Sequence, residues 1–269
     1  MNLRLGATKV QVVAGRAGID EAQETRKGVS RLTRQSSRRL TAAADFIVMH
    51  YSKNGGEIMS EFKKEYWGKF AQTFSDDQKY IVGEAVQVAI FNKLAEEREI
   101  GEAIELGCGA GFFSGALAKN AKHLIATDFS DEMLAIAKTQ LKEFRNITVQ
   151  KADCENTSFL SGKFDTVFMV NLLHVIENPH KCLAESHRIL KPGGLLFVIG
   201  YTSHSMKWLK KIKLIVRFMR KWGKPPRYFE GKMSPDKLEA LVKNVGFEVD
   251  EVQILGAESK ALYLKGRKK

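Results

Sequence analysis

Cysteine is scarce in this sequence, whose 269 residues include three, Cys108, Cys154 and Cys182. An odd number of widely spaced cysteines indicates reduced thiols in a cytoplasmic protein rather than a disulfide framework. No cysteine–histidine pair has the spacing of a zinc site, so no bound metal is expected. Long hydrophobic runs are also missing, since none approaches the ~18 residues that a membrane-spanning helix needs. These absences argue against disulfide-rich, zinc-dependent and membrane-spanning classes.

Acidic residues are few in two parts of the chain, which carries a net charge of +12. Residues 1–58 hold ten Lys or Arg against five Asp or Glu, and residues 207–227 hold nine basic residues and no acid. A basic balance is typical of proteins that contact nucleic acid, anionic membranes or acidic substrates, and also of proteins that are merely soluble. The charge alone therefore does not choose a partner.

Residues 1–58 differ in composition from the rest of the chain. They are rich in Arg, Ser, Ala, Gly and Thr and have weak periodicity, which predicts a disordered extension. A transit peptide is an alternative, although Asp20, Glu21 and Glu24 count against it. A third hypothesis is a mis-assigned start, because codons for residues 55–57 can spell a strong ribosome-binding site shortly before Met59. The expected organisation is an extension over 1–58 and a folded domain over 59–269.

From residue 60 onward, short apolar runs alternate with amphipathic stretches. This order predicts an α/β fold, a doubly wound Rossmann-like sheet of seven mostly parallel strands with an antiparallel final strand and helices on both faces. Strands are expected over residues 103–106, 123–127, 147–151, 164–170, 195–200, 247–254 and 261–265. Helices are expected over residues 61–74, 78–98, 112–120, 131–144, 179–190 and 235–244. Ser130 and Ser234 precede two of these helices and are expected to cap them.

A glycine-rich segment follows the first predicted strand. Gly107, Gly109 and Gly111 stand where the strand turns into a helix, a place where positive φ and close approach of a ligand both favour glycine. A tight turn without a ligand is the alternative. Asp128 ends the next strand, where a carboxylate can accept both ribose hydroxyls of an adenosine or cap the following helix. Asp153 ends the third strand at the same expected edge of the sheet.

Five segments in order resemble the motifs of class I methyltransferases that depend on S-adenosyl-L-methionine (SAM). They are AIELGCGAGFFS (103–114), IATDFSDEML (125–134), KADCEN (151–156), FDTVFMVNLLHVI (164–176) and RILKPGGLLFVI (188–199). The likeness is strongest to the methyltransferase type 11-like group, which includes ubiquinone and menaquinone biosynthesis methyltransferases. It covers the chain from about Tyr66 to its C-terminus. Such motifs are specific for the fold and the cofactor, and poorly specific for the methyl acceptor.

The resemblance implies a set of residues around SAM. Gly107, Gly109 and Gly111 would pass under the methionine and ribose parts of the cofactor, and Glu105 would support their loop. Asp128 would bind the ribose hydroxyls.

Further residues would complete that site by resemblance. Phe129 and Met133 would flank the adenine, whereas Asp153 would bind its amino group with the backbone of Cys154 beside it.

Two more parts of the chain are implied in the same way. Asn171 and the backbone of Leu172 would lie near the reacting sulfonium. The aromatic stretch YWGKFAQTF, residues 66–74, resembles a lid that folds over SAM, with Tyr66 as the expected contact. Core packing is the alternative for the other aromatic residues of this stretch.

Catalysis by such an enzyme needs a nucleophile held in line with the methyl group in a site that excludes water. A general base is needed only when the acceptor carries a proton. His174 is the candidate because it follows the fourth strand, and a structural histidine is the alternative. Tyr201 and His204, after the fifth strand, are further candidates.

Missing motifs narrow the methyl acceptor. DNA amino-methylating enzymes carry Asn/Asp-Pro-Pro-aromatic after the fourth strand, where this chain has Asn171-Leu172-Leu173-His174. Cytosine-C5 enzymes need a Pro-Cys pair and protein arginine methyltransferases a pair of glutamates, and neither is present there. A small-molecule or lipid acceptor is therefore expected and nucleic acid is disfavoured. The alternatives are a SAM-binding regulatory or inactive partner subunit and an RNA-directed methyltransferase. The sequence leaves the oligomeric state open.

An insertion over residues 203–232 separates the fifth strand from the last helix. Within residues 205–228, apolar residues follow helical spacing and basic residues largely take the other face. The apolar set is Trp208, Leu209, Ile212, Ile215, Val216, Met219 and Trp222. Two interpretations stay open: a substrate lid whose apolar face packs on the domain, and peripheral contact with an anionic membrane.

Overall fold

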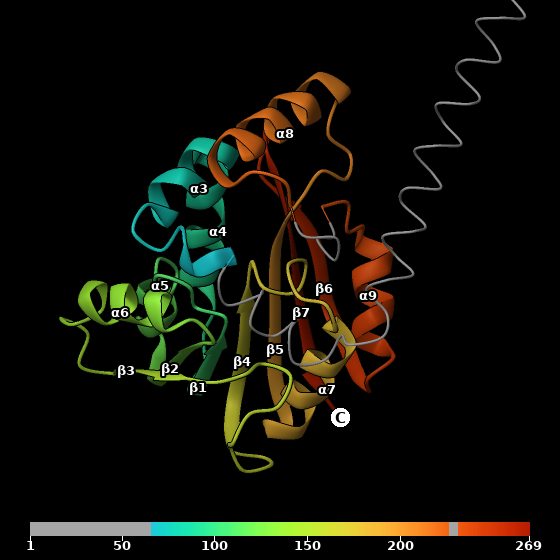
Figure 1. Ribbon diagram of the computed structural model, residues 1–269. Coiled ribbons are helices and arrows are strands. Elements are labelled where there is room, and N and C mark those ends of the chain that lie inside the picture. Colours follow the sequence, from blue (N-terminus) through green and yellow to red (C-terminus); the bar gives the residue numbers. More distant parts are fainter. Residues whose placement is uncertain (1–65, 226–230) are drawn as a thin grey trace, which may run out of the picture. The chain divides into compact units, whose positions relative to one another are not determined.

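The computed structural model describes residues 66–225 and 231–269, and the expectation for residues 1–58 lies outside them. Its centre is a seven-stranded sheet with the order β3-β2-β1-β4-β5-β7-β6 (Figure 1). The strands are β1 (Gly101–Leu106), β2 (Ala121–Asp128), β3 (Ile147–Lys151), β4 (Phe164–Val170), β5 (Leu190–Thr202), β6 (Phe247–Leu255) and β7 (Lys260–Lys268). The first five strands pair in parallel, and β7 runs antiparallel to both β5 and β6. The predicted fold class, with one antiparallel final strand, is confirmed.

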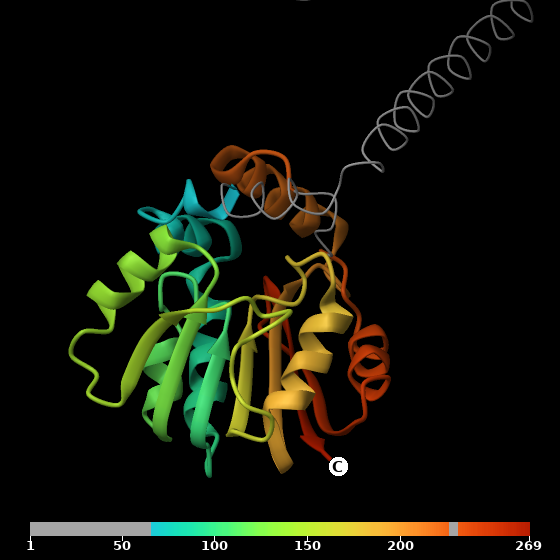
Figure 2. The ribbon, with the colours of Figure 1, turned by 60° about the horizontal axis from the view of Figure 1, so that its bottom comes forward.

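Helices cover both faces of this sheet (Figures 1 and 2). One face packs Phe168, Phe197 and Ile199 against α4 (Glu84–Glu96) and α5 (Ser114–Ala118), while α6 (Asp131–Gln140) covers β2 and β3. The other face packs Val167 and Val198 against α7 (Pro179–Ile189) and α9 (Pro235–Lys243). Alternate residues of each strand therefore enter two separate cores, as the period of a β-strand requires.

Two serines begin helices as the sequence predicts. The Ser130 hydroxyl accepts the backbone N–H of Met133 at the start of α6. The Ser234 hydroxyl accepts the backbone N–H of Lys237 at the start of α9, where Pro235 occupies the first turn. These bonds satisfy helix N–H groups that have no partner within the helix.

Several predicted boundaries are wrong. The single helix expected over residues 78–98 is two helices, α3 (Phe74–Val82) and α4, because Gly83 has a φ of 86° and ends the first. Of the helix expected over 61–74, the described part is helical only at residues 66–68 and continues as turns to Thr73. The helix expected over 131–144 ends at Gln140.

The fifth strand also begins earlier than the sequence suggests. Lys191, Pro192 and the two glycines after them were expected to separate α7 from a strand that starts at residue 195. Leu190 instead pairs directly with Phe164, and an irregular register lies between this pair and Thr166–Leu195. Proline has no backbone N–H to donate in a regular β-ladder. Pro192 is therefore accommodated where the pairing of β5 with β4 is irregular.

None of the helices in the described ranges is long and apolar enough to cross a membrane. Among residues 66–225 and 231–269 the longest helix is α8 (Trp208–Trp222), which contacts α3 at the end of the sheet where the parallel strands finish (Figure 1).

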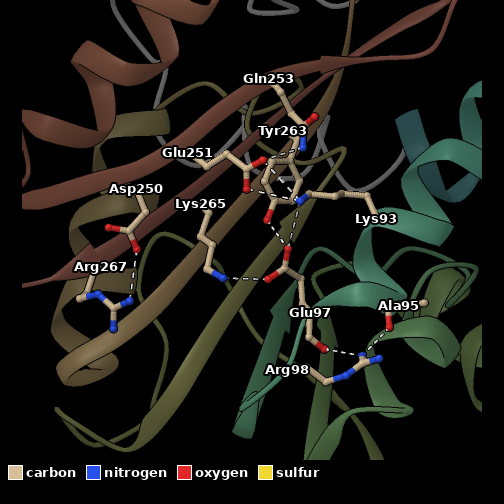
Figure 3. A network of polar contacts seen from close by, with 10 residues as sticks. All are labelled: Lys93, Ala95, Glu97, Arg98, Asp250, Glu251, Gln253, Tyr263, Lys265 and Arg267. Carbon is tan, nitrogen blue, oxygen red and sulfur yellow. Dashed lines mark hydrogen bonds and ion pairs between the residues drawn. The ribbon is translucent and has the colours of Figure 1, made fainter.

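A partly buried ion-pair network fastens α4 to the last strands (Figure 3). Glu97, just past the end of α4, accepts hydrogen bonds from the Tyr263 hydroxyl at 2.5 Å and from Lys265 Nζ at 2.9 Å. Lys93 Nζ lies 3.6 Å from the same carboxylate and 3.3 Å from Glu251. Burial alone would raise the pKa of Glu97, but the bonds from Lys265 and Tyr263 and the nearby positive charges outweigh it and lower the pKa.

Glu97→Gln is expected to reduce the free energy of unfolding by about 2 kcal/mol at pH 7, because Lys265 loses a charged partner in a buried place. The folded-state pKa of Glu97 is below the ordinary 4.5, so its stabilising contribution is present above pH 4.5 and is lost as the pH falls through the lowered pKa. Urea denaturation at pH 7 and at pH 3.5 measures both effects. Tyr263→Phe, which removes one hydrogen bond and no charge, is the matched control. Equal loss from Glu97→Gln at both pH values would contradict the assignment.

Candidate functional site

The three glycines form the loop between β1 and α5, and all have positive φ, at 72° for Gly107, 54° for Gly109 and 87° for Gly111. A Cβ added to Gly107 would lie 2.6 Å from Leu172 Cδ1, and one added to Gly111 would lie 2.9 Å from Leu141 Cδ1. At Gly109 the nearest atom would be Phe74 Cε1, at 3.6 Å. The outer two glycines therefore permit close packing, and at the middle one a methyl group would be in ordinary van der Waals contact with Phe74.

Glu105 lies beneath this loop. Its carboxylate is 1% exposed and accepts the Ser114 hydroxyl at 2.5 Å. Burial raises the pKa of Glu105 to about 7, with a smaller opposing effect from Ser114 and a smaller raising effect from the charge of Asp128. The Thr127 hydroxyl donates to the Glu105 carbonyl at 2.8 Å. These contacts agree with a supporting role in which Glu105 ties β1, β2 and the first turn of α5 together.

Asp128, at the end of β2, faces the glycine loop. Its Oδ2 accepts the backbone N–H of Gly109 and its Oδ1 that of Ser130, each at 2.9 Å. Burial raises the pKa of Asp128, although these backbone N–H groups oppose the shift. The helix-cap alternative for Asp128 is wrong because Ser130 occupies that position. Since each carboxylate oxygen has two acceptor sites, both oxygens keep capacity for a further donor such as a ribose hydroxyl.

The segment after β3 lies beside Asp128, because the Ala152 N–H donates to the Asp128 carbonyl at 3.1 Å. Asp153 is exposed and its Oδ1 accepts the Glu155 N–H at 2.9 Å. Cys154 is half-buried against the core under α7. Both predicted adenine-side residues of this segment therefore stand at the same edge of the sheet as Asp128.

The other two predicted adenine neighbours differ in exposure. Phe129 is half-buried, directly after Asp128. Met133 is 2% exposed and packs in a small cluster with Ala71 and Ala110, between the glycine loop and the segment before α3. The side chain of Met133 thus holds this segment on the loop.

Asn171, immediately after β4, has a φ of 60°, a conformation that is uncommon outside glycine. Its N–H donates to the Ile199 carbonyl at 2.7 Å, and its Oδ1 accepts the Tyr201 N–H at 3.2 Å. Its Nδ2 is buried and has no hydrogen-bond partner within residues 66–225 and 231–269. The backbone turn at Asn171 also delivers Leu172 onto Gly107. Strained backbone and an unused buried donor at a strand end are typical of functional positions.

His174 is buried, and its Nδ1 lies 3.0 Å from the place that a Cβ on Gly200 would occupy. Burial lowers the pKa of His174 to about 4, so the imidazole is neutral near pH 7. A neutral imidazole can accept a proton, but a low pKa weakens its basicity. The predicted base therefore packs against Gly200 of β5 as well as lying near the ends of the strands.

Two residues of the aromatic stretch, Tyr66 and Phe74, lie differently with respect to the glycine loop. The Tyr66 hydroxyl donates to the Trp222 carbonyl at 3.0 Å, which commits Tyr66 to α8. Phe74 stacks on Trp222 with ring centroids 5.3 Å apart and is the aromatic residue that reaches Gly109. The spacing of Trp67, Phe70 and Phe74, which all pack in this cluster, was the sequence signal for it.

The helix in the insertion is α8, but the apolar face that the sequence predicts is not the one that packs on the domain. Leu214, Phe218 and Trp222 contact the domain. Of the apolar set expected to form the face, only Trp222 is buried, and the other six side chains are exposed. The sequence spacing is compatible with either face, and the aromatic cluster at Trp67 and Phe74 selects the face that contains Trp222.

Part of the chain matches a known protein family. Residues 104–198 match the protein-family model described as "Methyltransferase domain". The ubiquinone biosynthesis O-methyltransferase of Pseudomonas aeruginosa is 24% identical over 155 residues, which cover 55% of this chain and 65% of that protein. The demethylmenaquinone methyltransferase of Clavibacter sepedonicus is 34% identical over 100 residues, 37% of this chain and 41% of that protein. The chain thus spans less than two thirds of the length of these relatives.

Solved structures share the fold. A SAM-dependent methyltransferase from Thermotoga maritima is similar with a TM-score of 0.57 and 22% identity, covering 76% of this chain and 100% of that one. The cyclase SpnF is similar with a TM-score of 0.54 and 16% identity, covering 66% of this chain and 80% of that one. The sequence resemblance to SAM-dependent methyltransferases is confirmed by the domain match, and these structures confirm the Rossmann-like fold.

Gly107→Ala is expected to lower the free energy of unfolding by about 2–4 kcal/mol, because the new methyl group combines a positive φ with overlap on Leu172. Gly109→Ala is the matched variant, since Gly109 also has positive φ but its new methyl group would meet only Phe74 Cε1, at 3.6 Å, and it is expected to cost about 1–2 kcal/mol. Adding Leu172→Ala to Gly107→Ala should remove the overlap, so the two changes should not be additive. Urea denaturation of the unaltered chain, of Gly107→Ala, Gly109→Ala and Leu172→Ala, and of the double variant measures these effects. Equal losses for the two glycine variants would contradict the packing role of Gly107.

Proposed function

We propose that this chain, whose residues 104–198 match a methyltransferase domain, transfers a methyl group from SAM to a small-molecule or lipid acceptor. The observation that carries the proposal is the meeting of the glycine loop, Asp128 and Asn171 at one edge of the sheet, with Phe74 over the loop. Ligands of open α/β sheets bind at this carboxyl edge.

Donor binding is assigned to the loop and the strand ends. Gly107, Gly109 and Gly111 bring the backbone close to the methionine and ribose parts of SAM. Asp128 is positioned by two backbone N–H groups to accept from the ribose hydroxyls. A carboxylate fixed in this way loses little side-chain entropy when the ligand binds.

The adenine side of the site comes from the strands at the sheet margin. Phe129 and Met133 follow Asp128, while Asp153 and Cys154 follow β3. Asp153 is exposed and can turn its free oxygen to an exocyclic amino group.

The chain's own contribution to the chemistry is to position the reactants and to exclude water from the site. SAM supplies a methyl group that is already activated for nucleophilic attack. Asn171 and Leu172 fix the end of β4, and Tyr66, Phe74 and Trp222 form an aromatic cover that excludes water. Holding two reactants in line can supply about 7–11 kcal/mol of the barrier reduction.

The proposal also names the class of molecule that accepts the methyl group. The quinone-biosynthesis names of the relatives support a small organic acceptor. When the acceptor is a lipid, residues 205–228 contact an anionic membrane peripherally. Nucleic acid is disfavoured because the motifs of the DNA-directed enzymes are missing from the segment after β4.

A SAM-binding regulatory or inactive partner subunit is the second candidate. The similarity to a cyclase shows that this fold also occurs in a protein named for a different activity. Incubating the purified chain with methyl-labelled SAM and separate pools of quinols, phenols, thiols and phospholipids distinguishes the two. Label transfer to one pool supports the enzyme. Tight SAM binding without transfer to any pool supports the regulator.

Asp128→Asn is expected to weaken SAM binding by about 1–3 kcal/mol, because an amide has one acceptor oxygen where the carboxylate has two. Isothermal titration calorimetry with SAM measures the change. Asp236→Asn removes the same charge from an exposed position on α9 and should leave the dissociation constant unaltered. An Asp128→Asn protein that binds SAM as the unaltered chain does would remove the ribose assignment.

His174→Gln tests the proposed base once an acceptor is known. A general base contributes about 10²–10⁴-fold to the rate, so kcat should fall within that range while SAM affinity stays. Because the pKa of His174 is about 4, the kcat of the unaltered enzyme should stay level down to about pH 5 and decline only near pH 4. A decline already near the ordinary histidine value of 6.5 would assign the proton transfer to another group.

A further inference from the structure

Helix α8 presents an apolar strip to solvent, which we call the outer stripe. Trp208 is 67% exposed and Leu209 63%, values far above those of buried core side chains. The outer stripe consists of Trp208, Leu209, Ile212, Ile215, Val216 and Met219. These positions recur at intervals of three and four, so they share one side of the helix. Clustered large apolar side chains on a surface, unlike single ones, mark a contact with a partner or a membrane.

The side of α8 that faces the domain is already occupied. Phe218 and Trp222 pack with the aromatic residues of 66–74, and Trp222 stacks on Phe74. The Tyr66 bond to the Trp222 carbonyl adds a polar attachment. The outer stripe therefore cannot turn inward without breaking this cluster, and its exposure is a fixed property of the folded domain.

Positive charge borders the outer stripe. Lys210 pairs with Glu258 at 2.5 Å and Lys221 with Asp77 at 2.7 Å, so both lysines form ion pairs with the rest of the domain. Lys213 and Arg220 are exposed and, at 3.6 residues per turn, adjoin Val216 and Leu209 on the flank of the stripe. Residues 207–225 contain no acidic side chain. A helix with a deep apolar side and cationic flanks fits the headgroup boundary of an anionic bilayer.

We propose that the outer stripe of α8 docks on the surface of an anionic lipid bilayer, with its apolar side chains inserted among the lipids and Lys213 and Arg220 at the phosphate level. A second copy of the chain is a poorer occupant, because two such faces would bring like charges together. Nucleic acid would meet the charges but not the six apolar side chains.

Docking has a consequence for the acceptor, and this part rests on the proposed methyl transfer. The inner side of α8 holds Tyr66 and Phe74, and Phe74 lies on Gly109. A docked α8 therefore sets the covered edge of the sheet next to the bilayer. An amphiphilic acceptor dissolved in the membrane can then reach the donor without crossing bulk water.

Trp208 is a native reporter for the test, since the other two tryptophans, Trp67 and Trp222, pack within the aromatic cluster. The full chain is mixed, without SAM, with vesicles of phosphatidylcholine containing 30% phosphatidylglycerol and with vesicles of phosphatidylcholine alone. Expected results are sedimentation with the anionic vesicles, at least tenfold weaker partition to the neutral ones, and quenching of Trp208 by lipids brominated on their acyl chains.

Matched variants separate the contribution of the apolar side chains to vesicle binding from that of the positive charges. Ile212→Ser with Met219→Ser should lower partition at least tenfold, and Lys213→Glu with Arg220→Glu should abolish it in the anionic vesicles. Leu160→Ser and Lys142→Glu alter an equally exposed apolar residue and a cation away from α8, and should partition as the unaltered chain does. Melting temperatures of all variants should be unchanged, because these side chains are exposed.

Three results would overturn docking: no sedimentation with anionic vesicles at low salt, no quenching of Trp208, or equal partition of the outer-stripe variant. Dimerisation in analytical ultracentrifugation that Ile212→Ser abolishes would instead assign the outer stripe to a second copy. Because vesicle binding is measured without methyl donor, failure of the proposed methyl transfer would leave this result standing. Vesicle binding together with label transfer only to water-soluble acceptors would overturn the acceptor route alone.

Discussion

Parallel pairing of β1 with both β2 and β4 is the constraint on which the site depends. It places the ends of three strands in register at one edge, so the loops that follow them must converge. The Gly107 loop and the turn at Leu172 then come so close that a single methyl group would not fit between them. The two loops of the candidate site are therefore one packed unit, and a change in either loop is transmitted to the other through van der Waals contact.

The sequence predicted the features that local chemistry determines. Apolar runs and the order of elements were sufficient for the seven-stranded sheet, and the glycines with Asp128 were sufficient for the loop and its partner. Ser130 and Ser234 were predictable because a cap is a contact between residues close in sequence. Asn171 was identified from the motif, but its positive φ and its unused amide are tertiary facts.

Tertiary choices account for what the sequence did not predict. Helical spacing over 78–98 continues across Gly83, so only the backbone conformation reveals two helices. In α8 two apolar sides compete, and stacking of Trp222 on Phe74, far away in the chain, decides between them. The same stacking brings Phe74 onto the loop, while the Tyr66 hydroxyl bonds to the last residue of α8. Burial of His174 likewise depends on packing against β5, and so does its lowered pKa.

The position of β7 has a consequence for biosynthesis. This strand, Lys260–Lys268, follows all other strands in the chain yet lies between β5 and β6 in the sheet. While the ribosome is still making those residues, β5 has a bare edge, β6 has no neighbour, and Glu97 lacks both Tyr263 and Lys265. Bare strand edges pair readily with other chains. The nascent protein is thus exposed to aggregation until β7 leaves the exit tunnel, and its need for chaperones should be greatest before that point.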